Sequence, residues 1–188
     1  DGNTDPRYAA ADLLSQAEHD IMASAVLVTD SMELALAVRE ELAEQLSKLE
    51  RRDIARASIE KNGKIIVTES IAEAITIANG IAPEHLEICV DKPFDYLPEI
   101  RNAGSIFLGR HCPEALGDYY SGTNHTLPTG GTARFGSPLS VDDFVKKSQY
   151  TYYSAQALAD AAGDIALFAE AEGLTGHARS VTIRMENK

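Results

Sequence analysis

The sequence contains little cysteine, no long apolar run and no targeting signal. Only two of its 188 residues are cysteines, Cys89 and Cys112. They are too few and too far apart for a disulfide framework or a thiolate metal site, so we expect reduced thiols. No stretch approaches the length that spans a membrane, and no signal-peptide pattern occurs. We therefore predict a cytoplasmic protein without a membrane partner. Because the chain begins at Asp1 without an initiator methionine, we also expect it to be part of a longer polypeptide.

Positive charge is also scarce. The chain has 29 acidic and 17 basic residues, which gives a formal net charge of -12. This balance argues against a nucleic-acid backbone as partner, and no basic cluster changes that conclusion. Hydrophobic residues make up 44% and charged residues 24%, as in globular domains.

Short apolar runs alternate with amphipathic stretches through the first hundred residues. Strands are expected at 23–29, 65–67, 86–90 and 105–108, and helices at 7–21, 30–49 and 70–78. This alternation predicts an α/β fold with a largely parallel sheet and helices on both faces. A long loop is expected at 109–138.

Beyond Ser140 the pattern becomes mostly helical. A short helix is expected at 141–147, a strand is possible at 150–153, a strong helix covers 155–172, and a last helix starts near Thr175. We therefore predict two domains, an α/β catalytic domain over residues 1–139 and a small helical tail over residues 140–188.

The segment Gly117 to Gly131 carries the strongest functional signal. It places an acid, hydroxyls, an amide, an imidazole and four glycines on backbone without core periodicity. Such a loop is suited to binding or transforming a ligand. Asp118 and His125 are its candidate functional side chains.

Two further polar pairs allow either a functional or a structural interpretation. Gln16 and His19 lie three residues apart on a predicted helix, where they could be neighbouring metal ligands or a simple polar face. Glu84 and His85 precede a strand. They could form a general acid/base pair if the backbone is irregular there, or only a solvated strand start.

The remaining histidines form no local metal motif. His177 lies in the tail with Glu172 five residues before it, and His111 has only a thiol, Cys112, as companion. Alone, both read as ordinary structural residues. Any metal site must therefore be assembled from distant parts of the chain.

Taken in order, four segments resemble the C-terminal half of histidinol dehydrogenase. The similarity covers essentially the whole chain, and its second and third segments are highly specific. The four segments are Ala11 to His19, Ala82 to Ile88, Gly117 to Phe135, and Gly173 to Ala178.

This resemblance implies NAD-dependent oxidation of L-histidinol to L-histidine through the aldehyde, the last steps of histidine biosynthesis, with bound zinc. The implied zinc ligands are Gln16, His19, Asp118 and His177, which would also contact the substrate. Glu84 and His85 would be the acid/base residues. His85, His125 and Glu172 match substrate-binding positions.

The resemblance also implies an assembly and a missing part. Family members are homodimers whose helical tail reaches into the partner's site, so Glu172 and His177 would serve the other subunit. They are more than twice this length, and their NAD site lies in the N-terminal half. Accordingly, the chain shows no Gly-x-Gly-x-x-Gly fingerprint. We expect an incomplete Rossmann-like domain without its NAD site.

Two other functions stay open from the sequence. The chain could be a metal-binding, dimerising module that is inactive without its NAD-binding half. It could also be a zinc hydrolase, although zinc that is occupied in chelating substrate activates water poorly.

Overall fold

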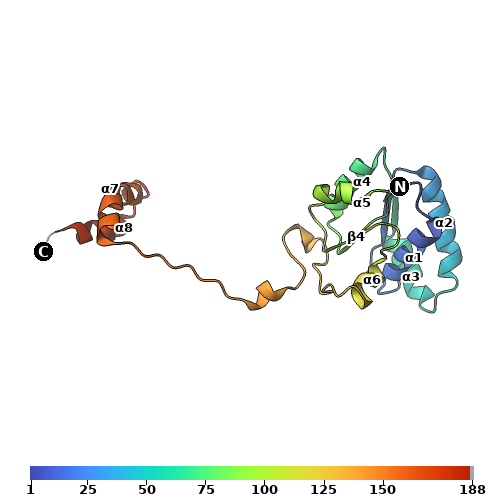
Figure 1. Ribbon diagram of the computed structural model, residues 1–188. Coiled ribbons are helices and arrows are strands. Elements are labelled where there is room, and N and C mark those ends of the chain that lie inside the picture. Colours follow the sequence, from blue (N-terminus) through green and yellow to red (C-terminus); the bar gives the residue numbers. More distant parts are fainter. Residues whose placement is uncertain (187–188) are drawn as a thin grey trace. The chain divides into compact units, whose positions relative to one another are not determined.

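A computed structural model describes residues 1–186 of the chain. It divides into two compact units, residues 1–145 and the chain from residue 146 onward. Each unit is described by itself. Figure 1 shows the elements of both units, coloured along the sequence.

The first unit contains four short parallel strands. β1 (Val26–Thr29) pairs with β2 (Lys64–Val67), and β3 (His85–Ile88) pairs with β4 (Ser105–Leu108). The predicted α/β class and the parallel direction are confirmed. Within the described residues the strands form two separate pairs rather than one continuous sheet.

Residues of β1, β3 and α4 (Ile71–Ile81) together line a cavity of about 520 Å³. Polar side chains from the neighbouring elements reach the same cavity, among them Gln16, His85, Glu87 and Glu114. The space between the two strand pairs is therefore also the place where candidate site residues meet.

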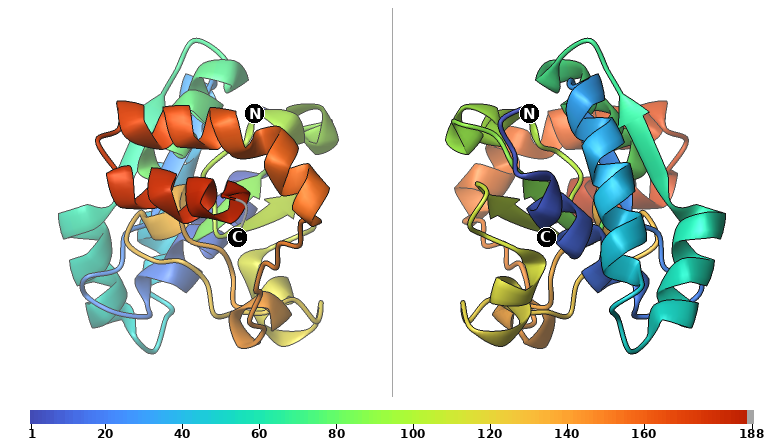
Figure 2. Two further views of the ribbon diagram at one scale, coloured as in Figure 1. Left: turned by 90° about the vertical axis from the view of Figure 1, so that its left-hand side faces the viewer. Right: turned by 90° about the vertical axis from the view of Figure 1, so that its right-hand side faces the viewer.

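Helices cover the strands on two sides, as Figure 1 shows. α1 (Pro6–Ala17), α2 (Met32–Leu46) and α3 (Arg52–Asn62) pack together, and their cores include Leu14, Val38 and Ala55. Figure 2, right, shows α2 running alongside α1. α4 contacts β1 as well.

Local signals explain where these helices begin. Asp5 accepts a hydrogen bond from the Arg7 amide at the start of α1, where Pro6 fits the first turn. Ser31 and Ser70 cap α2 and α4 in the same way, each accepting from an amide three residues on.

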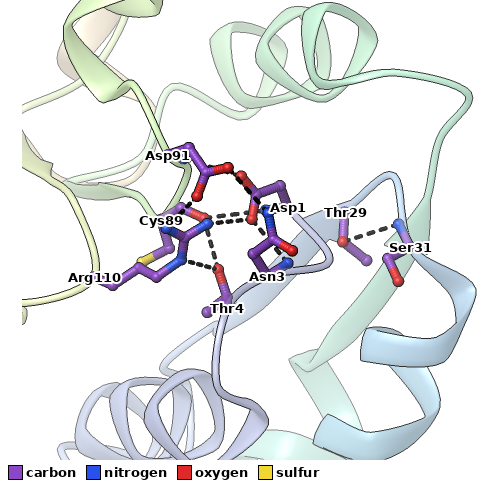
Figure 3. A network of polar contacts seen from close by, with 8 residues as sticks. All are labelled: Asp1, Asn3, Thr4, Thr29, Ser31, Cys89, Asp91 and Arg110. Carbon is purple, nitrogen blue, oxygen red and sulfur yellow. Dashed lines mark hydrogen bonds and ion pairs between the residues drawn. The ribbon is translucent and has the colours of Figure 1, made fainter.

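A polar network joins the segment before α1 to the end of β3 (Figure 3). The Thr4 hydroxyl donates to the Cys89 carbonyl at 2.7 Å. The Arg110 guanidinium donates to the Thr4 hydroxyl at 3.1 Å and to Asp91 at 2.7 Å, and it also pairs with Asp1. The network fixes the entry of α1 relative to β3, and these two elements carry candidate site residues.

Several sequence predictions about elements were wrong, and the first helix, expected at 7–21, already ends at Ala17. The helix expected to run to residue 49 ends at Leu46, and a separate helix, α3, follows it. The loop expected at 109–138 contains α6 (Glu114–Tyr119) and a 3-10 turn at Thr132–Arg134. The possible strand at 150–153 does not form.

Further short elements complete the first unit. They are α5 (Pro93–Tyr96) and 3-10 turns at Leu97–Glu99 and Val141–Phe144. The last of these replaces the helix expected at 141–147, because the backbone leaves the helical region at Val145.

The second unit is a helical hairpin. α7 (Ala155–Ala171) packs against α8 (Thr175–Thr182) through Ala166, Ala169 and Ala178, and a 3-10 turn (Ile183–Met185) follows. Several large apolar side chains remain exposed on this small unit, with Leu167 and Phe168 both 69% exposed. Among the described residues of both units, no helix is long and apolar enough to cross a bilayer.

Candidate metal and acid/base site

His85 is the first residue of β3 and lies beside Phe107 of β4. Its ring centroid is 6.1 Å from that of Phe107, at a tilt of 50°. The side chain is 18% exposed. The strand pairing with Ser105 and the Phe107 ring hold the imidazole in a half-buried position that ligands can still reach.

The backbone before His85 is irregular, as an acid/base pair of adjacent residues requires. Ala82 has a φ of 53°, the only positive value among the described non-glycine residues. Such strain is often found at functional sites. The Glu84 carbonyl accepts the Ser105 amide at 2.8 Å, which anchors Glu84 just outside β3.

The short helix α6 brings Glu114 and Asp118 to the same place. They are four residues apart, so both side chains lie on one face. Glu114 Oε1 lies 3.9 Å from His85 Nε2, and the Glu114 side chain is 13% exposed. One ligand atom from each of His85, Glu114 and Asp118 lies within 4.8 Å of the others. This spacing is small enough for one cation to bridge them.

The two carboxyl groups of this cluster, Glu114 and Asp118, lie close to each other. Burial, followed by the adjacent Asp118 carboxylate, raises the pKa of Glu114, while His85 and His19 act in the opposite direction. A bound cation would relieve the same repulsion. Cys89 does not belong to this group within the described residues, and burial raises the pKa of its thiol to about 12.

The first predicted ligand pair lies at the end of α1. The helix ends at Ala17, so His19 occupies the following turn rather than the helix itself, and its amide donates to the Gln16 carbonyl at 3.3 Å. Gln16 lines the same cavity as His85 and Glu114. His19 is close enough to Glu114 to lower its pKa.

His125 meets Asp118 from the glycine-rich loop. Its Nδ1 lies 3.9 Å from Asp118 Oδ2, and its side chain is 71% exposed against 19% for Asp118. The two candidate residues of this loop are thus brought together, with the aspartate inside and the histidine at the rim.

Glu172 and His177 lie in the second unit. Together with Phe168, Leu174 and others they line one surface pocket between α7 and α8. Within this unit the structure therefore brings these two tail residues to one place.

Sequence reasoning missed Glu114, Glu87 and Asp12. Glu114 precedes Asp118 by four residues, a spacing that indicates a shared helical face, but the glycines of this region favoured a loop. Asp12 precedes Gln16 by four residues and Glu87 follows His85 by two. Those spacings place each of them beside a predicted site residue.

Fold and site together define an α/β protein with a half-buried cluster of histidine and carboxylate side chains at the edge of parallel strands. The sequence model of the family "Histidinol dehydrogenase" matches residues 1–185. The chain belongs to the histidinol dehydrogenase family.

Curated relatives and a solved structure agree with this assignment. The chain is 56% identical over 187 residues to a histidinol dehydrogenase of Caldanaerobacter subterraneus, covering 100% of the chain and 44% of that protein. It is 56% identical over 188 residues to one of Geobacter metallireducens, covering 100% and 43%. The crystal structure of histidinol dehydrogenase from Elizabethkingia anophelis matches with a TM-score of 0.88 and 38% identity, covering 97% of the chain and 42% of that protein. The chain thus spans less than half the length of these relatives.

The fit of α6 against β4 generates a prediction about Gly117. A Cβ atom at Gly117 would lie 2.6 Å from the Phe107 ring, so Gly117→Ala must displace the ring or the helix that carries Glu114 and Asp118. We expect a loss of about 1–3 kcal/mol in the free energy of unfolding, measured by urea titration followed by circular dichroism.

Gly80→Ala is the matched control, because a Cβ atom there meets nothing within 4 Å. It should leave stability unchanged or raise it by up to about 1 kcal/mol, since alanine favours helices over glycine. Equal stability of the two variants would contradict the close packing of α6 on Phe107.

Proposed function

We propose that the protein carrying this chain oxidises L-histidinol to L-histidine through histidinaldehyde, using NAD and zinc, in the last steps of histidine biosynthesis. The observation that supports this most directly is that a member of this family brings the proposed ligand Asp118 next to the proposed base His85, with one ligand atom of each within 4.8 Å of the other. Free thiols at Cys89 and Cys112 suit the reducing cytoplasm, where we place the enzyme.

The chemistry of the side chains fits a zinc ion. Gln16, His19 and Asp118 of the first unit and His177 of the tail would supply oxygen and nitrogen ligands of the kind zinc accepts. The repulsion between Glu114 and Asp118 marks a place where positive charge is favoured. When bound, zinc would act as an orienting template for the substrate.

The acid/base work falls to Glu84 and His85. In the first oxidation His85 would accept the hydroxyl proton of the alcohol while its carbon gives up a hydride, for which one NAD molecule is the acceptor. In the second, Glu84 would take a proton from the water that adds to the aldehyde, and the resulting ionised hydrate would give up a hydride for which a second NAD molecule is the acceptor. The Phe107 ring lies beside the imidazole of His85, whose side chain is 18% exposed.

The tail would complete the site of a second copy. Glu172 and His177 share one pocket of the helical hairpin, and the hairpin exposes large apolar side chains that a partner could cover. We therefore propose a homodimer in which each tail supplies His177 as a ligand, and Glu172 as a substrate contact, to the partner. His125, at the rim beside Asp118, would contact substrate from the chain's own side.

NAD would bind through the part of the enzyme that this chain does not contain. The curated relatives are more than twice as long as the matched region, which favours one alternative, a module that binds metal and dimerises but is inactive by itself. The active enzyme and the inactive module can be distinguished by measuring NADH formation from histidinol. The assay compares this chain alone with the native polypeptide, by which we mean the longer protein of about the relatives' length that carries this chain. Turnover by the chain alone would exclude the inactive module.

Removing a first-unit ligand should abolish both metal binding and turnover. We expect His19→Ala and Asp118→Ala, made in the native polypeptide, to lose zinc by elemental analysis and to lose histidinol oxidation, because each variant removes one of the four proposed ligands and so weakens the grip on the ion.

His111→Ala is the matched control, since His111 is an exposed histidine of the same unit outside the cluster. It should keep wild-type zinc content and turnover. Full zinc content in either ligand variant would remove that residue from the metal site.

The separate roles of Glu84 and His85 predict different kinetic defects. Glu84→Gln keeps the size of the side chain but removes the base for the water, so oxidation of the aldehyde should fall about 10²–10⁴-fold and oxidation of the alcohol much less. Single-turnover assays starting from histidinol and from histidinaldehyde measure the two stages. Equal losses at both stages would contradict water activation by Glu84.

A further inference from the structure

Glu87 is a half-buried carboxyl group that the proposed chemistry does not use. It lies on β3, two residues beyond His85, so both side chains point to the same face of the strand. Both line the cavity between the strand pairs. Glu87 is thus placed behind the acid/base residue rather than in the cluster itself.

The first contact of Glu87 is with α6. Its Oε1 accepts the backbone amide of Glu114 at 2.9 Å. This amide belongs to the first turn of the helix, where amides lack partners within the helix, and Pro113 at the N-cap position provides no side-chain bond. Glu87 therefore caps from outside the helix that carries Glu114 and Asp118.

The second contact of Glu87 is with α1. Asp12, four residues before Gln16 on the same helical face, lines the same cavity as Glu87. Burial, followed by the neighbouring Asp12 carboxylate, raises the pKa of Glu87 to about 8.

We propose that Glu87 is a positioning residue, which joins α1, β3 and α6 and so aligns Gln16 and His19, His85, and Asp118 with one another. The hydrogen bond to the Glu114 amide and the cavity shared with Asp12 carry this inference, and its catalytic consequence rests on the proposed function. Because Glu87 lies on β3 and adjoins both α1 and α6, its removal should loosen the fit of all three elements.

The experiment compares three substitutions in the native polypeptide. Glu87→Gln retains the geometry, because its amide oxygen can accept from Glu114 and its amide nitrogen can donate to Asp12. Glu87→Ala removes both contacts. Ser58→Ala is a control for general destabilisation, since Ser58 is 0% exposed, donates to the Ala23 carbonyl at 2.9 Å and belongs to α3, which carries no candidate site residue.

Two measurements are made on each protein. Hydrogen exchange, followed by mass spectrometry, reports the protection of the α6 amides without any metal. Zinc competition with a chelating dye reports metal affinity. For Glu87→Ala we expect faster exchange in α6 and a dissociation constant for zinc raised about 10–100-fold. Glu87→Gln should stay close to wild type in both, and Ser58→Ala should keep wild-type zinc affinity.

The inference is overturned if Glu87→Ala leaves α6 exchange unchanged, or if Glu87→Gln is as impaired as Glu87→Ala. Weakened zinc binding by Ser58→Ala to the same degree would also overturn it. If the wild-type protein binds no zinc, the proposed function fails, and the exchange comparison by itself still decides the role of Glu87.

Discussion

The candidate site depends on how the electrostatic repulsion among four neighbouring carboxyl groups is reduced. Asp12 with Glu87, and Glu114 with Asp118, form two pairs of neighbouring carboxyl groups near His85. The first is called the inner pair and the second the outer pair. In the inner pair, burial raises the pKa of Glu87 and so reduces the repulsion from Asp12. The outer pair faces His85 and His125, where a cation and a substrate could bind.

The two pairs therefore suit different roles. The inner pair lies between α1 and β3 and is placed to stabilise their packing, whereas the outer pair on α6 is placed to attract a cation. Both pairs are positioned by contacts that are distant in the sequence, such as the Phe107 ring against Gly117 and the Glu87 carboxyl against the Glu114 amide. A substitution that shifts α1, β3 or α6 should therefore also change the position of the His85 side chain.

Much of the fold could be predicted from sequence because its signals are local. Serine caps and apolar periodicity locate α2, α4 and α7, and a short apolar run locates β4 with its observed bounds. The helix α3 was missed because its buried positions, Ala55 and Ser58, are small and add little hydrophobicity to a charged stretch. The strand expected at 150–153 came from aromatic residues that find no pairing partner within the described chain.

The site was only partly predictable for a similar reason. Asp118 and His125 stood out because their loop has no core pattern, and the structure does bring them together. Glu114 did not, because the glycines around it hid a helix whose shape is fixed by the distant Phe107. Glu87 and Asp12 looked like ordinary polar positions of a strand and a helix. The positioning role proposed for Glu87 rests on its contact with the Glu114 amide of another element, which no local pattern reports.

The central claim is a single cation shared by distant side chains, and one diffraction measurement tests it most directly. Crystals of the native polypeptide grown with zinc and histidinol would be measured at the zinc absorption edge. The account predicts one anomalous peak per site, bonded to Gln16, His19 and Asp118 of one copy and to His177 of the other. A peak held by His85, Glu114 and Asp118 instead, or no peak near Asp118, would contradict it.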